Sequence, residues 1–432
     1  MDRRGVSDDF ESLLTDVPGP RSRELAAALR AHEARGVTFL SDDWPIFWES
    51  AHGALVTDVD GNRFIDLTSA FGVATAGHTN TRVRAAIAVQ SENLVHGLGD
   101  VHPSRMRVQL LEELARLGPG DLDVTFLCSS GSEAVDFALK TAYLRARRPS
   151  VLAFTGSYHG LTASALSVTG IERFRTPFAP FVRSDVFFAP FPAPLHNLEM
   201  VFRAQRIGTV IVEPIQGRAG VVVTPRGWLA GVRALCDLYG AVLIFDEIYT
   251  GFGRTGTMFA CEYESVVPDL LCVGKAIANG VPLAGVIGKR KVMDAWEPSR
   301  GEALHTSTYL GNPLACAAAL ANIAEITGGG LVERAHTVGA QLGKRLQRLR
   351  DEYPLVTAVR GRGMLWGLQL SSAEAAFETT KAALRHGAIV LPSGTNGDVI
   401  TLAPPVTIAE GQLMHAVDLL ERALSTLTVG GN

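Results

Sequence analysis

Cysteine is scarce in this sequence and forms no recognisable pattern. The five cysteines are scattered, odd in number and without a CxxC pair. This spacing excludes a disulfide framework and a cysteine-based metal site, because both need cysteines at defined intervals. We therefore expect reduced core cysteines in a cytoplasmic protein, at Cys128, Cys236, Cys261, Cys272 and Cys316.

The sequence also lacks a charge excess and a long hydrophobic run. Its formal net charge is −4 and its isoelectric point is about 6.3, so electrostatics give no reason to expect nucleic acid or an anionic membrane as a partner. No apolar run approaches the ~20 residues that a membrane-spanning helix needs. The first ten residues are too charged for a signal peptide. We expect neither a membrane nor a nucleic-acid partner.

The chain does have enough hydrophobic residues for a large core. Hydrophobic residues make up 47% of its 432 positions and charged residues 19%, which is typical of a compact globular protein. A chain of this length is too long to fold around one small hydrophobic core, so we expect a large domain and a smaller second domain. We place an N-terminal segment at 1–60, a large domain at 61–320 and a small C-terminal domain at 321–432, with the N-terminal segment packing on the small domain.

Short apolar runs alternate with helical segments through the middle of the chain. These candidate strands are 124–128, 151–154, 209–213, 241–246, 270–273 and 284–287. Strands that are apolar throughout are typical of a parallel sheet covered on both faces. The pattern predicts an α/β fold with a mostly parallel central sheet and a separate α+β region after it. Nearer the N-terminus, Asp60-Gly61-Asn62 predicts a hairpin turn.

The segment SSGSEA, residues 129–134, follows the first of these strands. Ser130 and Glu133 have the spacing of a capping box, and the free N–H groups of a first helical turn form an anion site. A phosphate there would accept hydrogen bonds from the backbone and from the hydroxyls of Ser130 and Ser132. An ordinary capped helix is the alternative for this motif alone.

Polar or aromatic residues end the next strands as well. Tyr158 and His159 follow the second strand, and a tyrosine there would add ~0.5–1.5 kcal/mol by stacking on a flat ring. Glu213 ends the third strand and Asp246 the fourth, with Ile248 on the same face as Asp246. Taken singly, each residue has an ordinary structural explanation: the tyrosine packs in the core, the histidine has its hydrogen-bond partners there, and the carboxylates belong to turns. Together they predict one ligand site, because ligands of such sheets bind beyond the carboxyl ends of the strands.

Lys275 follows the fifth strand and lies between two apolar stretches. A buried lysine is costly unless its charge is neutralised, paired or chemically used. A lysine that can form an imine, with a carboxylate at a nearby strand end, suits pyridoxal 5′-phosphate: Lys275 holds the aldehyde and Asp246 keeps the ring nitrogen protonated. Once released, Lys275 would act as general base, because its apolar surroundings lower its pKa. No residue pattern suggests a metal.

Taken together, the motifs resemble those of the class III (ω-amino) aminotransferases of pyridoxal phosphate fold type I. The resemblance covers roughly residues 36–425. It rests on DEIYTGFGRTG at 246–256, PD and GK at 268–269 and 274–275, HTSTYLGNP at 305–313, SSGSEA at 129–134, YHG at 158–160 and EPIQG at 213–217.

The resemblance implies that Lys275 is the Schiff-base lysine and Asp246 the partner of the pyridine nitrogen. Tyr158 would cover one face of the cofactor ring and Ile248 the other. Tyr249 stands where many members have a glutamine that contacts the 3′ oxygen of the cofactor. The remaining implied cofactor residues are Ser130, Gly131, Ser132, His159 and Glu213. Ser307 and Thr308 would reach the cofactor phosphate of the neighbouring subunit, which implies a homodimer with two shared sites.

The substrate residues depart from the common family pattern. Leu161 and Thr401 stand where members that bind α-carboxylates often have arginine, and neither supplies a guanidinium fork. We therefore expect a substrate without an α-carboxylate, such as a terminal amine, an amino sugar or an aminocyclitol. Arg218 is either a solvated loop charge or a substitute for the missing arginines. Trp48 and Phe71 are either an apolar substrate wall or packed hairpin aromatics.

These observations favour an aminotransferase that moves an amino group between an amino donor and an aldehyde or ketone acceptor. The first alternative is a racemase or epimerase of amino acids, their amides or lactams, which would use the same lysine without a second substrate. The second is a binding or regulatory protein without catalysis. The retention of Lys275 and Asp246 argues against that second alternative.

Overall fold

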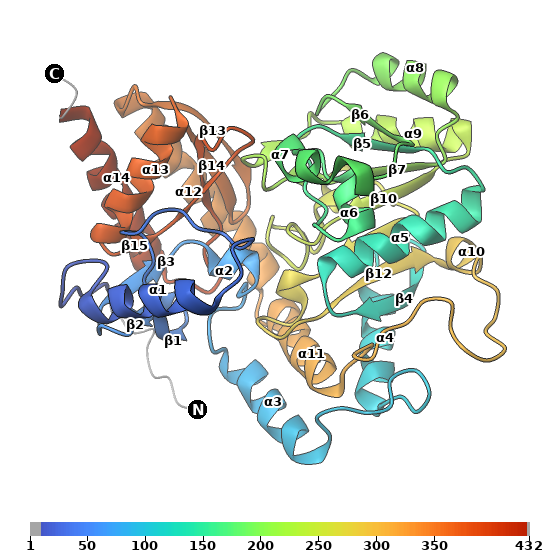
Figure 1. Ribbon diagram of the computed structural model, residues 1–432, viewed down its shortest axis with the longest axis horizontal. Helices are drawn as coiled ribbons and strands as arrows, with labels where there is room; N and C mark the ends of the chain where they lie inside the picture. Colours follow the sequence, from blue (N-terminus) through green and yellow to red (C-terminus); the bar gives the residue numbers. More distant parts are fainter. Residues whose placement is uncertain (1–9, 430–432) are drawn as a thin grey trace.

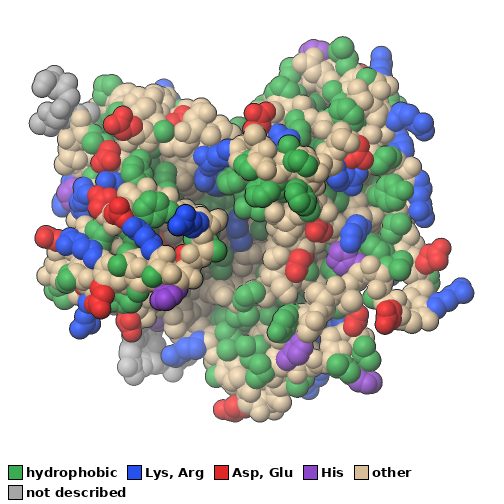
Figure 2. Space-filling model, viewed as in Figure 1, with side chains coloured by type: hydrophobic (Ala, Val, Ile, Leu, Met, Phe, Trp, Pro, Cys, Tyr) green, Lys and Arg blue, Asp and Glu red, His purple; other side chains and the backbone are tan. Residues whose placement is uncertain are grey.

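The computed structural model describes residues 10–429, which form two lobes (Figure 1). The larger lobe contains the middle of the chain, and the smaller lobe combines the N-terminal segment with the C-terminal part. Residues 1–9 and 430–432 lie outside the described residues. The charged N-terminus lies mostly in this part of the chain. The first residues of the predicted N-terminal segment and the last residues of the predicted C-terminal domain lie there too. Between the lobes the surface is hollowed, and charges of both signs are interspersed on the face seen in Figure 2.

A seven-stranded sheet forms the centre of the larger lobe. Every neighbouring pair is parallel except the two pairs that involve β12, which runs against both of its neighbours. All six predicted strands are present, and the edge strand β6 was missed. In spatial order the strands are β4 (Leu122–Cys128), β12 (Ala284–Lys289), β11 (Leu270–Val273), β10 (Val242–Asp246), β7 (Thr209–Val212), β5 (Val151–Phe154) and β6 (Val186–Ala189).

Both faces of this sheet are buried, which explains its unbroken apolar strands. In β10, Val242 and Ile244 pack on the face covered by α5 (Gly131–Ala146), whereas Leu243 and Phe245 belong to the larger core on the opposite face. Alternate side chains of a strand point to opposite faces, so each strand serves two cores. The opposite face is covered by α4 (Arg105–Leu117), α8 (Leu195–Gln205), α9 (Trp228–Tyr239) and α11 (Pro313–Gly328).

An antiparallel sheet of four strands organises the smaller lobe. Its spatial order is β13 (Val356–Arg362), β14 (Leu365–Leu370), β17 (Val399–Leu402) and β16 (Leu391–Ser393). It packs against α12 (Leu331–Glu352) and α13 (Ala373–Arg385), and α14 (Glu410–Val429) packs against both of these helices. This is the α+β region expected after the parallel sheet.

The N-terminal segment joins the C-terminal part through a second small sheet. In that sheet β1 (Trp48–His52), β2 (Leu55–Asp58) and β3 (Arg63–Asp66) are antiparallel, and β15 (Ala388–Ile389) pairs with β3 in parallel. The turn between β2 and β3 is the predicted hairpin. Its backbone N–H groups at Asp60 and Asn62 donate to the Asp58 carboxylate. The domain limits at 60 and 320 stay a prediction.

The other elements are short or connect the lobes. They are α1 (Pro20–His32), α2 (Ser69–Gly72), α3 (Thr81–Asn93), α6 (Ala163–Val168), α7 (Glu172–Arg175), α10 (Arg290–Met293), the strands β8 (Ile215–Gln216) and β9 (Val222–Val223), and 3-10 turns at Thr176–Phe181, Ala260–Glu264 and Lys275–Ile277.

Arg254 makes hydrogen bonds to three separate parts of the chain. Its guanidinium is fully buried and donates to the Met364 and Pro404 carbonyl oxygens, and to the Ser69 and Thr75 hydroxyls. A buried cation needs such partners because it has lost its water. The segment after β10 is therefore tied to both the N-terminal segment and the smaller lobe.

Among residues 10–429, no single helix is long and apolar enough to cross a membrane. Only α11 and α12, bent by 62°, reach that length and hydropathy when joined. The same part of the chain has no cluster of three or more His, Cys, Asp or Glu side chains placed to bind a metal ion. All five cysteines are buried and unpaired.

Candidate active site

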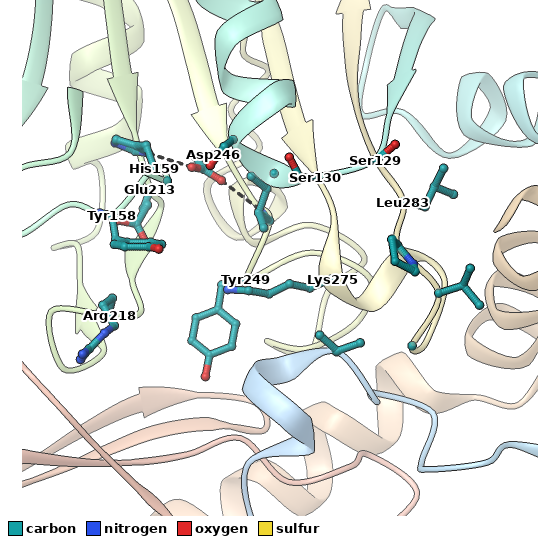
Figure 3. A pocket seen from close by; sticks show the side chains of 18 residues that line it. Ser129, Ser130, Tyr158, His159, Glu213, Arg218, Asp246, Tyr249, Lys275 and Leu283 are labelled. Atoms are coloured by element: carbon teal, nitrogen blue, oxygen red, sulfur yellow. Dashed lines mark hydrogen bonds and ion pairs between the residues drawn. The ribbon is translucent and has the colours of Figure 1, made fainter. Parts of the chain in front are cut away.

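A cavity of about 390 Å³ lies at the carboxyl ends of the central strands (Figure 3). This is where the sequence predicts the ligand of a parallel sheet to bind. Most of the predicted cofactor residues line it, together with one predicted substrate residue. They are Ser130, Gly131, Ser132, Tyr158, His159, Glu213, Asp246, Ile248, Tyr249 and Lys275, and Arg218 on the substrate side.

Asp246, the last residue of β10, is held by two hydrogen bonds. Its Oδ2 lies 2.7 Å from His159 Nδ1, and its Oδ1 accepts a bond from the Ile248 N–H at 3.1 Å. Because a carboxylate only accepts, His159 donates from Nδ1. The buried Nε2 of His159 has no partner among the described residues. The carboxylate is therefore fixed in orientation while it lines the cavity.

Lys275 enters the cavity from the end of β11 with an unusual backbone conformation. Its φ is +43°, a left-handed value that is uncommon outside glycine and often marks a functional position. Burial lowers the pKa of Lys275 to about 8, although the charges of Asp246 and Glu213 oppose that shift. A substantial fraction of the amine is therefore neutral near physiological pH, as a nucleophile or base requires.

Glu213 joins two segments of the cavity wall. Its carboxylate accepts hydrogen bonds from the Tyr158 N–H at 2.8 Å and the Gly217 N–H at 3.2 Å. Burial raises the pKa of Glu213 to about 7, with a further contribution from the Asp246 charge. The side chain thus links the end of β5 to the end of β7 and titrates near neutrality.

Tyr249 occupies a space that two glycines leave open. A Cβ atom on Gly72 would lie 2.3 Å from the Tyr249 ring, and one on Gly217 would lie 2.1 Å from it. Contacts this short do not occur between real side chains, so both positions need glycine while Tyr249 is present. Burial raises the pKa of Tyr249 to about 12, so the phenol stays neutral at physiological pH.

The first turn of α5 has the expected form of an anion site. Ser130 and Glu133 make the predicted capping box, which uses the N–H groups of Ser129, Ser130 and Glu133. The N–H groups of Gly131 and Ser132 have no acceptor within the helix and are available to an anion. A Cβ on Gly131 would lie 2.8 Å from Ile248 Cδ1. One on Gly160 would lie 2.0 Å from Ser132 Oγ. Glycine at these positions lets the α5 start pack closely against the cavity wall.

Six predicted residues do not line the cavity of this chain. Trp48 packs edge-on against His78, with the two ring centres 5.6 Å apart. Thr401 is buried in β17 and its hydroxyl bonds to Ser393. Phe71 and Leu161 are exposed, and so is Thr308. The hydroxyl of Ser307 is buried without a partner among the described residues. The roles assigned to these six residues stay predictions.

The sequence reasoning missed part of the cavity wall. The missed residues are Val73, Ser129, Gly160, Gly280, Val281, Pro282 and Leu283. The segment 280–283 returns to the cavity because Asn279 and Gly280 both adopt positive φ, which reverses the chain after Lys275. The Asn-Gly pair before β12 was the available signal for that turn.

The chain matches known aminotransferases over most of its length. Residues 39–424 match the family "Aminotransferase class-III". The chain is 37% identical to the 4-aminobutyrate aminotransferase of Mycobacterium leprae, over 95% of this chain and 97% of that protein. It is 35% identical to the 5-aminovalerate aminotransferase of Pseudomonas putida, over 89% and 94%.

Solved structures agree with this assignment. A transaminase from the marine bacterium Virgibacillus has a TM-score of 0.89 at 26% identity, covering 95% of this chain and all of that one. An amine transaminase from an uncultivated Pseudomonas species has a TM-score of 0.85 at 29% identity, covering 91% and 98%. These names do not support the racemase alternative. The chain belongs to the class III aminotransferases, a pyridoxal phosphate-dependent enzyme family of fold type I.

Proposed function

We propose that this aminotransferase transfers the amino group of a terminal amine to a carbonyl acceptor, with pyridoxal phosphate held in the described cavity. One observation carries the proposal: a lysine with a lowered pKa shares a single cavity with an oriented carboxylate. When bound, the cofactor supplies an aldehyde for the amine and an electron-withdrawing ring.

The residues present fit this cofactor. Lys275 would hold the aldehyde, and Asp246 would face the ring nitrogen. Tyr158 and Ile248 both line the cavity and would cover the two faces of the ring. The start of α5, with Ser130, Gly131 and Ser132, would bind the phosphate through N–H and hydroxyl donors.

In the reaction, this chain's side chains would bind the substrate and move a proton. After the substrate amine has displaced it from the aldehyde, Lys275 Nζ would take the proton from the substrate carbon that bears the amino group, and would give that proton up again before it returns to the aldehyde. Asp246 stays in place because His159 Nδ1 and the Ile248 N–H hold its two oxygens. Glu213 keeps the Tyr158 backbone at the cavity wall.

A terminal-amine substrate is supported by what the cavity lacks and by the named relatives. Leu161 and Thr401 provide no arginine for an α-carboxylate, and neither lines the cavity. The relatives' names give 4-aminobutyrate and 5-aminovalerate as substrates, and both carry the amine at a chain end. An ω-amino acid is therefore the substrate that we favour over an amino sugar or an aminocyclitol.

A homodimer is supported by exposed apolar side chains beside Ser307 and Thr308. Leu94, Leu98, Val101, Leu304 and Tyr309 are each between 41% and 84% exposed in the single chain. Exposed apolar residues gathered in two neighbouring loops mark an interaction surface. In a dimer, Ser307 and Thr308 would serve the cavity of a second copy of this chain. Sedimentation of the purified protein tests this, and a monomer at micromolar concentration would contradict it.

A donor screen tests the substrate class. The cofactor-loaded enzyme is mixed with one donor at a time, and loss of the absorption of the aldehyde form reports amino transfer. We expect 5-aminovalerate and 4-aminobutyrate to react faster than glutamate or alanine. Faster reaction of glutamate than of every terminal amine would overturn the proposal. The Lys275→Ala variant is the control, and it should show no amino transfer with any donor.

A further inference from the structure

Arg218 is a cation in the wall of the active-site cavity, and residues 10–429 provide no anion that pairs with it. It follows β8 and lines the cavity with Tyr158, Tyr249 and Lys275. No described residue makes a hydrogen bond or an ion pair with its guanidinium. A partly buried guanidinium without an anion has lost water and gained no partner in exchange. The position therefore favours an anionic ligand.

The backbone around Arg218 is fixed by the smaller lobe. The Gly394 N–H donates to the Arg218 carbonyl oxygen at 3.1 Å. Two residues later, Arg360 Nε donates to the Gly220 carbonyl oxygen at 2.7 Å. These bonds hold the loop against the sheet of the smaller lobe. Arg218 is thus presented from a tethered segment rather than from a free surface loop.

The neighbours of Arg218 are hydrogen-bond donors and another cation. Burial lowers the pKa of Arg218 from its ordinary value, and the charge of Arg173 adds to that shift. The phenols of Tyr158 and Tyr249 are also close enough to affect it electrostatically. Neither phenol hydroxyl has a hydrogen-bond partner among the described residues. The surroundings suit an acceptor with several lone pairs, such as a carboxylate.

The position of Arg218 separates it from both the phosphate site and the reacting amine. In Figure 3, Ser130 and Arg218 lie on opposite sides of the cavity, and Tyr249 lies between Arg218 and Lys275. An α-carboxylate would share a carbon with the reacting amine and so lie next to Lys275. A carboxylate at Arg218 would instead lie on the other side of Tyr249 from Lys275, as Figure 3 shows these side chains.

We propose that Arg218 binds the carboxylate at the far end of an ω-amino acid and so selects this substrate over a neutral amine. The inference rests on the proposed terminal-amine function. It assigns carboxylate recognition to a residue of the loop after β8, in a chain whose Leu161 and Thr401 leave that role open. The planar guanidinium fork matches a carboxylate with two parallel hydrogen bonds.

The first test compares two substrates of equal length in the cofactor-loaded enzyme. These are 5-aminovalerate, which has the far carboxylate, and pentylamine, which has none. We expect Arg218→Met to weaken apparent binding of 5-aminovalerate roughly 10- to 100-fold, the loss typical of a charged hydrogen-bonded pair, with pentylamine changed less than about twofold. Arg218→Lys should recover part of the loss. Arg173→Met is the matched control, because it removes a nearby positive charge, and we expect it to retain 5-aminovalerate binding.

The second test measures binding without turnover. Pentanoate has the carboxylate but no amine, so calorimetric titration reports binding without reaction, and the difference between the wild type and Arg218→Met reports the contribution of Arg218. We expect pentanoate to bind the wild type and Arg173→Met with similar affinity, and Arg218→Met at least tenfold more weakly. Equal pentanoate affinity in the wild type and Arg218→Met would overturn the proposal.

Two further outcomes separate the possible errors. If Arg218→Met impairs alanine, whose only carboxylate is the α-carboxylate, but not 5-aminovalerate, then Arg218 binds an α-carboxylate and our assignment is wrong. If the wild type transfers no amino group from either 5-aminovalerate or pentylamine, the proposed terminal-amine function fails. In that case the pentanoate titration still decides whether Arg218 binds a carboxylate.

Discussion

The side-chain nitrogen of Lys275 lies 4.0 Å from the centre of the Tyr249 ring. The face of an aromatic ring attracts a cation, which favours the protonated lysine. Burial disfavours it and has the larger effect, because the pKa of Lys275 is lowered to about 8. Together with the charges of Asp246 and Glu213, which also favour the protonated lysine, these effects set the fraction of neutral amine available for cofactor binding.

The reactivity of Lys275 should follow this pKa. In the cofactor-free protein, we expect its modification by an amine-directed reagent to rise with pH through an inflection near pH 8, well below that of exposed lysines, because only the neutral amine reacts. Peptide mass spectrometry of samples modified at several pH values measures this directly. Tyr249→Phe keeps the ring and should keep the inflection. Tyr249→Leu removes the ring, so the inflection should move to lower pH. An inflection near pH 10.5 in the wild type would contradict the prediction.

Glu213 should make the stability of the cofactor-free protein depend on pH. Its folded pKa of about 7 lies above the ordinary value of 4.5, so the folded state binds more protons between those pH values. The free energy of unfolding should therefore fall as pH rises from 4.5 to 7, by up to about 3 kcal/mol from this group. Urea unfolding at pH 5 and pH 7.5 measures the change. In Glu213→Gln the decrease should be smaller, and an unchanged decrease would show that other groups cause it.

The strand pattern made most of the fold predictable, because strands buried on both faces are apolar throughout. Strand β6 was not predicted because it lies at the sheet edge, where its residues Val186, Phe187 and Phe188 are only partly buried. The pairing of β3 with β15 was not predicted either, since nothing local in either segment specifies a partner more than 300 positions away. Local patterns report burial better than they report long-range pairing.

The site residues at the ends of strands could be predicted from the sequence. The site residues whose positions depend on loops could not. Asp246 and Lys275 follow strands, so their meeting at the sheet edge follows from parallel topology. The lack of an ion-pair partner for Arg218 among the described residues, and the fit of Tyr249 between Gly72 and Gly217, depend on segments that are far apart in the sequence. Such contacts have no signal in the local sequence.

His159 should strengthen cofactor binding by orienting Asp246 rather than by contacting the cofactor itself. The bond from its Nδ1 to Asp246 Oδ2 fixes the carboxylate, and His159→Phe removes that donor while keeping a planar ring. We expect pyridoxal phosphate affinity to fall roughly 10- to 100-fold, the typical loss for a hydrogen bond to a charged group. Spectral titration of the cofactor-free protein measures this. His159→Asn keeps a donor and should lose less, whereas equal losses in both variants would indicate a packing role.

Arg254 should contribute to stability because it ties the two lobes to the N-terminal segment. Arg254→Met removes the donors to the Met364 and Pro404 carbonyls and leaves these buried acceptors without a partner. Each such loss costs about 1–3 kcal/mol, so the urea midpoint of the cofactor-free protein should fall clearly. Arg350→Met, at an exposed site on α12, is the matched control and should leave the midpoint nearly unchanged. Arg254→Lys keeps the charge but not the planar fork, so we expect an intermediate midpoint. If Arg254→Met has the same urea midpoint as the wild type, other contacts hold the lobes together and the buried guanidinium does not contribute to stability.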